Sequence, residues 1–256
     1  MKIVIIGSGN TATVLGRKLK AAGHQIVQVY GRNIKKAAEL AKELESASAS
    51  QWNHVNEHAD VYLLAVSDNS IRDVSLKLQL PGKIIVHTAA SVSKHVLKDA
   101  SSRYGVFYPL QSLRADTEYM PDIPILIDAG DEATLKTLDT LAHSISDKVI
   151  ETSDEERLKL HLAAVCCNNF VNHLYVLTEN YCQKEGIDFS ILIPLIKETA
   201  ARPEHLLPSL SQTGPAIRND QQTINSHLAA LEKYQPLKAI YELFTKSIKE
   251  CEAHNP

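Results

Sequence analysis

The amino-acid sequence predicts an α/β fold, a doubly wound and mainly parallel sheet that is followed by an all-helical C-terminal domain. Up to Thr152, apolar strand-like runs alternate with helical segments, which is the order of elements in a parallel sheet. The first run, residues 3–6, is apolar and β-branched throughout, as expected of a strand buried on both faces. After Thr152 the β signal disappears. We therefore expect two domains, residues 1–152 and residues 153–256.

Composition narrows the class of protein. Of the 256 residues, 44% are hydrophobic and 22% are charged, which is typical of a soluble globular chain. The formal net charge of −3 gives no electrostatic attraction for nucleic acid. No apolar run approaches the ~20 residues of a membrane span, and the first strand follows Met1 directly, which leaves no room for a signal peptide. We expect a cytoplasmic protein with a small-molecule substrate.

The turn after the first strand carries a phosphate-binding pattern. Gly7, Gly9 and Ala12 form G-x-G-x-x-A between a strand and a helix. Gly7 permits the tight turn, Gly9 lets a pyrophosphate approach the backbone, and Ala12 lets the helix pack closely. The helix N-terminus adds free N–H groups for the phosphates. We predict a Rossmann-type site in which a dinucleotide lies over Gly7, Ser8, Gly9, Asn10 and Thr11. The alternative is a parallel-sheet turn with chance glycines.

The end of the next expected strand, residues 25–30, indicates which dinucleotide binds. NAD sites of this type usually place Asp or Glu there for the ribose 2′-hydroxyl, whereas this chain has Arg32 and Asn33, followed by Lys35 and Lys36. A guanidinium pairs with a 2′-phosphate that a carboxylate would repel. We therefore predict NADP(H) as the cofactor, with Arg32 and Asn33 at its 2′-phosphate. The alternative is that these cations only solvate the start of the next helix.

Further strand ends complete the predicted cofactor site. Strands are expected near residues 50–55 and at residues 59–66, 84–87, 104–108, 124–128 and 148–152, about eight in one sheet. Ligands of such sheets bind at the carboxyl ends of the strands. The cofactor-binding candidates at these ends are Val66, Ser67, Asp68, His87 and Thr88. His54 and His58 have metal-ligand spacing only on a helix and lack a third ligand nearby, so no metal site is predicted.

The C-terminal domain is expected to consist of helices. One helical pattern runs without interruption from Ser153 to about Lys184, and others cover residues 189–202, 221–233 and 237–251. His161, Asn168 and Asn172 lie at i, i+7 and i+11 of the first helix and therefore on one face. We predict these three as catalytic residues on the wall of a substrate cleft, with His161 as proton donor and Asn168 holding a carbonyl or imine. The alternative is that they form hydrogen bonds across a dimer or helix interface.

Six short motifs give the chain a family resemblance. They are Gly7-Ser8-Gly9-Asn10, Ala65-Val66-Ser67-Asp68, His87-Thr88-Ala89-Ala90-Ser91, Tyr108-Pro109-Leu110-Gln111-Ser112, His161-Leu162-Ala163-Ala164-Val165 and Gln212-Thr213-Gly214-Pro215-Ala216. With these motifs the chain resembles the two-domain dehydrogenase superfamily of pyrroline-5-carboxylate reductase and 6-phosphogluconate dehydrogenase. More closely, it is similar to an uncharacterised bacterial family that pairs a Rossmann-like NADP-binding domain with a helical domain of unknown function. The resemblance implies a nicotinamide-cofactor oxidoreductase that dimerises through its helical domain.

These observations favour an NADP(H)-dependent reductase or dehydrogenase that acts on a small carbonyl or imine. The hydroxyacid branch of the superfamily uses a helix Lys four residues before an Asn, and this chain has Ala164 four residues before Asn168, which counts against that branch. A second hypothesis is a non-catalytic NADP-binding or assembly protein, because no complete acid–base constellation is visible. A third, on fold analogy alone, has a deazaflavin such as coenzyme F420 as the hydride partner.

Overall fold

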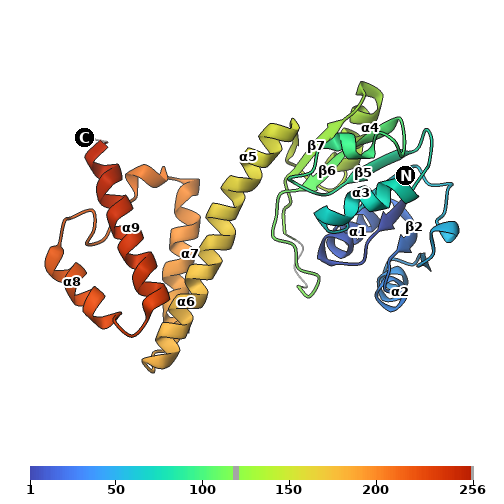
Figure 1. Ribbon diagram of the computed structural model, residues 1–256. Helices are drawn as coiled ribbons and strands as arrows, with labels where there is room; N and C mark the ends of the chain where they lie inside the picture. Colours follow the sequence, from blue (N-terminus) through green and yellow to red (C-terminus); the bar gives the residue numbers. More distant parts are fainter. Residues whose placement is uncertain (118–120, 255–256) are drawn as a thin grey trace. The chain divides into compact units, whose positions relative to one another are not determined.

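An eight-stranded sheet organises the N-terminal part of the chain (Figure 1). The structure, a computed structural model, describes residues 1–117 and 121–254. The strands follow the order β3-β2-β1-β4-β5-β6-β7-β8. All neighbours from β3 to β6 are parallel, β7 is antiparallel to β6, and β8 is parallel to β7. The predicted doubly wound, mainly parallel sheet is therefore confirmed, with β1 (Lys2–Ile6), β2 (Gln25–Tyr30), β3 (Ala47–Ala49), β4 (Val61–Leu64), β5 (Ile84–His87), β6 (Arg103–Pro109), β7 (Ile125–Ala129) and β8 (Val149–Glu151).

Helices cover both faces of this sheet. Residues of α1 (Asn10–Ala21), α2 (Ile34–Glu43) and α4 (Glu132–His143) pack on one face. Those of α3 (Asp68–Lys77) and of the 3₁₀ segment η2 (Lys94–Leu97) pack on the other. The alternation along β1 explains the two layers. Ile3 and Ile5 join one core cluster, Val4 and Ile6 join the other, and all four side chains are fully buried. The carboxyl ends of β1, β2 and β4 consequently meet at one edge.

The third strand lies earlier than expected. The sequence indicates a strand near residues 50–55, whereas β3 is Ala47–Ala49 and a 3₁₀ turn, η1 (Trp52–His54), occupies part of the expected segment. That expectation is wrong because β3 is a three-residue strand at the edge of the sheet, made of small side chains without a strand-like apolar pattern. Its pairing with β2 holds it in place instead.

The chain divides into two compact units, Met1–Val165 and Cys166–Pro256. The domain boundary expected from the sequence, between residues 152 and 153, lies before α5 (Asp154–Ala164). In the structure, α5 belongs to the same compact unit as the sheet. The start of this helix is fixed by a capping box, in which the Ser153 hydroxyl accepts from the Glu156 N–H and the Glu156 carboxylate accepts from the Ser153 N–H. The buried side chain of Arg157 ties the first turn to the loop after β5.

The helix that begins with α5 is not a regular α-helix throughout. A π-helical segment, Val165–Phe170, joins α5 to α6 (Val171–Lys184). The sequence predicted an uninterrupted helical pattern to Lys184, and the backbone is helical over that stretch, but its hydrogen-bond spacing changes at the π segment. A π turn holds more residues than an α turn, so the 3.6-residue repeat of α5 does not continue in register into α6.

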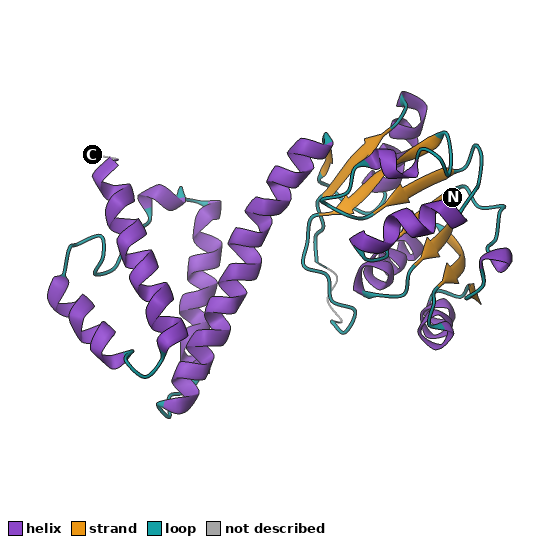
Figure 2. Ribbon diagram, viewed as in Figure 1, coloured by secondary structure: helices purple, strands orange, loops and turns teal. Residues whose placement is uncertain are grey.

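The second unit, as far as residue 254, consists of helices and connecting loops (Figure 2). After α6 come α7 (Ile193–Ala201), α8 (Gln221–Ala230) and α9 (Gln235–His254), with 3₁₀ turns η4 (Phe189–Leu192), η5 (Arg202–Glu204) and η6 (Pro208–Leu210). No helix among the described residues is both long and apolar enough to span a membrane. Many large apolar side chains of this unit are exposed: Phe170, Val176, Ile187, Ile191, Ile193, Leu195, Leu206, Leu207, Leu210, Leu243 and Phe244.

Candidate functional site

A groove of about 480 Å³ lies at the carboxyl ends of β1, β2 and β4. Its walls come from the turn after β1, the tip of β2, the η1 turn, the end of β4 and one side of α3. Of the predicted cofactor-binding residues it contains Gly7, Ser8, Gly9, Arg32, Asn33, Val66 and Ser67. This is the edge at which ligands of open parallel sheets bind. The topology thus brings together residues from three separate strand ends.

The glycine turn has the geometry of a phosphate cradle. Gly7 has a φ of +132°, and a Cβ there would lie 2.1 Å from the carbonyl oxygen of Ala65. No other residue fits that position. A Cβ on Gly9 would meet nothing within 4 Å, so the space beside its backbone is open. Gly9 is also the N-cap of α1 and supplies no side-chain cap, which leaves the first N–H groups of the helix for an anion.

The tip of β2 supplies a cation and a helix cap. Arg32 is exposed, lines the groove, and among the described residues has no ion-pair partner. Asn33 has a structural role in addition to its place in the groove, because its Oδ1 accepts from the N–H groups of Lys35 (3.1 Å) and Lys36 (3.3 Å). The arrangement leaves the Arg32 guanidinium as the group at this tip that can bind a phosphate.

Three of the predicted cofactor residues lie beside the groove without lining it. Asn10 is exposed at the start of α1, and its Oδ1 accepts from the N–H of Ala115 at 3.2 Å. Thr11 follows it in the first turn of α1. Thr88 is half-buried, and both its N–H and its hydroxyl donate to the carbonyl of Leu64. Their contact with a cofactor stays a prediction.

His87, another predicted cofactor residue, is buried. It is the last residue of β5 and its side chain is 0% exposed. Its Nδ1 accepts from the N–H of Ala89. Burial, and then the nearby positive charge of Arg157, lower the pKa of His87 to about 4. A neutral, buried ring that holds the loop after β5 is therefore the role that the structure supports, and the cofactor contact of His87 stays a prediction.

A second polar cluster lies at the carboxyl ends of β4, β5 and β6. Asp68, at the start of α3, accepts a hydrogen bond from the Ser91 hydroxyl at 2.9 Å. Tyr108, near the end of β6, has its hydroxyl 3.0 Å from Nδ1 of His161 on α5. Burial and then the negative charge of Asp68 raise the pKa of Tyr108, so the phenol is protonated at neutral pH. The cluster can hold and deliver a proton.

A buried cation fixes the loop that carries Ser91. Arg157 is 0% exposed and donates to the carbonyls of Ala90 (3.0 Å) and Val92 (2.7 Å) and to the carboxylate of Asp154 (2.6 Å). Its other side faces Asp128, whose carboxylate also accepts from Lys94 at 2.6 Å. Hydrogen bonds to a charged group in a buried setting are strong, so the loop after β5 and the first turn of α5 form one rigid piece.

The other two predicted catalytic residues are exposed on their helix. Asn168 lies in the π segment and Asn172 in the first turn of α6. Neither side chain is buried, so neither needs a hydrogen-bond partner inside the protein. The common face expected with His161 rested on a regular α-helical repeat, and the π segment changes that repeat between His161 and Asn172. Their catalytic roles stay predictions.

Some site residues carry no recognisable signal in the sequence. Tyr30, Trp52, Asp73 and Lys77 line the groove, and Tyr108 supplies the hydroxyl that His161 contacts. Trp52 and Lys77 are far from the glycine turn in sequence and reach the groove only because β3 pairs with β2 and α3 follows β4. Tyr108 could have been found, since it ends a predicted strand at the carboxyl edge.

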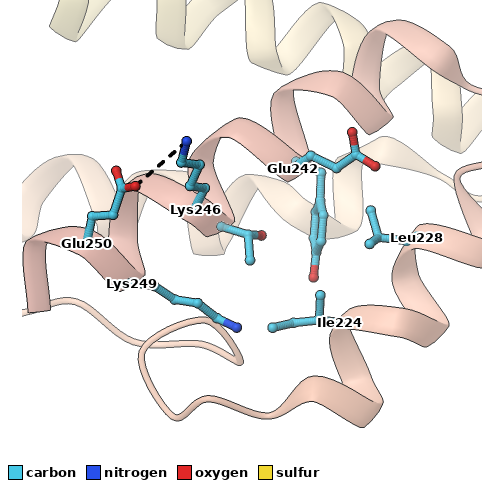
Figure 3. A pocket seen from close by; sticks show the side chains of 8 residues that line it. Ile224, Leu228, Glu242, Lys246, Lys249 and Glu250 are labelled. Atoms are coloured by element: carbon cyan, nitrogen blue, oxygen red, sulfur yellow. Dashed lines mark ion pairs between the residues drawn. The ribbon is translucent and has the colours of Figure 1, made fainter. Parts of the chain in front are cut away.

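The helical unit has a hollow of a different kind (Figure 3). It measures about 330 Å³ and lies between α8 and α9. Ile224 and Leu228 form its apolar side, and charged side chains of α9 stand at its rim, where Lys246 and Glu250 form a 3.8 Å ion pair. Its lining contains none of the predicted site residues, and the described residues hold no metal-binding cluster.

Comparison with known proteins agrees with this geometry. A family model described as "NADP oxidoreductase coenzyme F420-dependent" matches residues 2–91, and a "domain of unknown function (DUF2520)" matches residues 123–248. No curated protein sequence matches the chain.

Several solved structures match this chain over nearly its whole length. A "putative NADP oxidoreductase" from Bacteroides fragilis is 36% identical, with a TM-score of 0.90, and the match covers 97% of this chain and 98% of that one. A protein from Thermotoga maritima is 24% identical, with a TM-score of 0.80 and coverage of 98% and 99%. A reductive aminase from Aspergillus terreus, in complex with NADPH and ethyl-5-oxohexanoate, shares the fold at 16% identity, with a TM-score of 0.73 and coverage of 100% and 99%.

The residues of the groove fit NADP(H). The open backbone at Gly9 suits a pyrophosphate, and the unpaired Arg32 suits a 2′-phosphate. The N-terminal family is one of NADP oxidoreductases, which confirms the predicted cofactor. The predicted resemblance to a family that joins an NADP-binding domain to a helical domain of unknown function is confirmed as well. The chain belongs to the family of two-domain NADP oxidoreductases in which an F420-dependent-type NADP domain is followed by a DUF2520 domain.

Proposed function

We propose that the protein is an NADP(H)-dependent reductase of a small carbonyl or imine compound. The observation that carries the proposal is the hydrogen bond between Tyr108 and His161, 3.0 Å long, at the sheet edge where the cofactor groove opens. Bound NADPH supplies a hydride to the substrate carbon. The reduced oxygen or nitrogen then needs one proton, and the protein must provide it.

The Tyr108 hydroxyl is the proton donor in this proposal. Its raised pKa keeps the phenol protonated at neutral pH. In the tautomer with hydrogen on Nδ1, the His161 ring donates to the phenol oxygen and leaves the phenolic proton free for the substrate. After the transfer, the same N–H stabilises the phenolate. It then returns its proton to the phenolate as Nε2 takes up a proton from solvent, so that the ring stays neutral. His161 thus supports the donor, instead of acting as the donor that the sequence predicted.

The strand β6 offers a matched control for this pair. Tyr104 lies four residues before Tyr108, and its hydroxyl is also 3.0 Å from a histidine Nδ1, that of His95. Tyr104 is near the start of the strand, away from the carboxyl edge. The two tyrosines therefore share residue type, strand and kind of partner, but only one stands at the proposed site.

The test is turnover of NADPH with a panel of small ketones, aldehydes and cyclic imines. We expect Tyr108→Phe to lower kcat by a factor of about 10² to 10⁴, the usual contribution of a positioned acid, with little change in NADPH affinity. Tyr104→Phe should keep near-normal turnover. Equal effects of the two substitutions would contradict the role of Tyr108. Binding of NADPH without turnover of any compound would favour the non-catalytic NADP-binding protein.

Coenzyme F420 is a second candidate for the hydride partner. The description of the N-terminal family, which includes coenzyme F420, favours it. In that case the deazaflavin, and not a carbonyl or imine, would exchange a hydride with NADP(H). Calorimetric titration with F420 distinguishes these two candidate hydride partners. Binding of F420 in the presence of NADP⁺ would support the deazaflavin as the partner. Absence of binding would support a small carbonyl or imine.

We also propose that the helical unit pairs with a second copy of the chain. Ile191, Leu207 and Leu210 are each at least 67% exposed, and single domains seldom leave so many large apolar side chains in water. Sedimentation should give the mass of a dimer, and Ile191→Glu should shift it toward the monomer. A monomeric wild type would refute the pairing.

A further inference from the structure

Two cations face the cofactor groove without an anionic partner. Arg32 stands at the tip of β2, and Lys77 is the last residue of α3. Within residues 1–117 and 121–254 neither forms an ion pair, whereas Arg17, Lys20 and Lys94 each hold a carboxylate. Unpaired cations that line one cavity indicate an anionic ligand.

Trp52 stands beside Lys77 in the same wall. Its indole stacks on Tyr30, with ring centroids 4.1 Å apart and an interplanar angle of 29°. Tyr30 is 4% exposed and therefore holds the indole in a fixed position. The Lys77 ammonium lies 6.0 Å from the indole centroid, at the outer limit of a cation–π contact. The Lys77 ammonium can consequently turn away from the indole toward a phosphate, which frees that face of the ring.

We propose that Lys77 and Trp52 form, together with Arg32, the adenosine 2′-phosphate end of the NADP(H) site. Lys77 is the second cation on the 2′-phosphate, and Trp52 is the apolar wall against which the adenine packs. Asp73 is the only carboxylate among the described lining residues and repels a phosphate, so the phosphate lies on the side of the cations. This inference rests on NADP(H) as the cofactor and does not depend on the substrate.

Lys77→Met tests the second cation, with Arg72→Met as its matched control. Arg72 is an exposed cation on the same helix that does not line the groove. Binding of NADPH and of NADH is followed by the fluorescence of Trp52, the only tryptophan of the chain. We expect Lys77→Met to raise the Kd for NADPH roughly tenfold or more and to leave the Kd for NADH within about twofold. Arg72→Met should change neither.

An equal loss for the two cofactors in Lys77→Met, or no loss for either, would overturn the role of Lys77. The indole is tested separately by calorimetry with 2′,5′-ADP, which carries only the adenosine end of the cofactor. Trp52→Leu should weaken that binding roughly tenfold, and Trp52→Phe should restore most of it, because base–aromatic packing tolerates another ring. If Trp52→Leu binds 2′,5′-ADP as tightly as the wild type, the proposed packing of the adenine against Trp52 is overturned.

The unliganded thermal midpoint of each variant shows whether it has folded. Because both experiments measure binding, a failure to turn over any substrate would overturn the proposed reductase and not this site. A wild-type protein that binds neither NADPH nor 2′,5′-ADP would overturn the site itself.

Discussion

Replacing Arg157 by Met tests how strongly one buried cation stabilises the N-terminal unit. The Arg157 side chain has no exposed surface and donates to the carbonyls of Ala90 and Val92 and to the carboxylate of Asp154, at 3.0, 2.7 and 2.6 Å. Met occupies a similar volume but leaves these three acceptors without their donor. Removing one partner of a buried, hydrogen-bonded ion pair costs about 3–5 kcal/mol, and the 36% exposure of the Asp154 side chain places this pair at the lower end of that range. We expect Arg157→Met to lower the free energy of unfolding by about that amount.

Lys159→Met is the matched control for this change. Lys159 lies on the same helix and pairs with Glu155 at 2.5 Å, but the two side chains are 70% and 77% exposed. Exposed pairs contribute about 0–1 kcal/mol. The assay is urea unfolding followed by the emission of Trp52, which lies in the N-terminal unit. Equal losses in the two variants, or a loss below about 1 kcal/mol in Arg157→Met, would refute the argument that burial sets the strength of this pair.

The glycine turn and the buried histidine lead to two more expectations. Gly7→Ala places a Cβ 2.1 Å from the Ala65 carbonyl at a φ of +132°, so the thermal midpoint should fall and NADPH should bind more weakly, as calorimetry can measure. His87 has a folded pKa of about 4 against an ordinary 6.5, so between these values the unfolded chain binds the proton first. Stability should therefore be full above pH 6.5 and decline as the pH falls toward 4. Urea unfolding across that pH range should show that the free energy of unfolding depends less on pH in His87→Asn than in the wild type. An equal pH dependence in the two proteins would contradict the lowered pKa of His87.

The sheet could be predicted from the sequence because its central strands are buried on both faces. Residues 3–6 of β1 and all residues of β4 are fully or nearly fully buried, which requires unbroken apolar runs that are visible in the sequence. The edge strand β3 needs no unbroken apolar run, because its Ala-Ser-Ala segment is held by pairing with β2 alone. The π segment likewise left no sign, since its side chains are compatible with an α-helix and only the hydrogen-bond spacing differs.

In the candidate site, too, some residues could be predicted from the sequence and others could not. Gly7 and Gly9 could be found because a local turn and a local helix N-terminus determine them. Trp52 and Lys77 could not, because their place in the groove depends on which strands become neighbours and on where α3 ends. The burial of His87 could not be predicted for a related reason, because its position at the end of a strand indicates nearness to the ligand edge but not how deeply the ring is buried.

The anchor of α5 connects the stability of the N-terminal unit with its proposed chemistry. Arg157 and His161 are four residues apart, so one helical turn joins the buried cation to the ring that contacts Tyr108. The cation also holds the carbonyls of Ala90 and Val92, on either side of the residue that donates to Asp68. Loosening this anchor should therefore disturb both halves of the polar cluster while the groove, which is built on β1, β2 and α3, keeps its shape. Arg157→Met protein that is still folded should then bind NADPH normally and turn it over slowly, a combination that a purely structural role for the cluster would not produce.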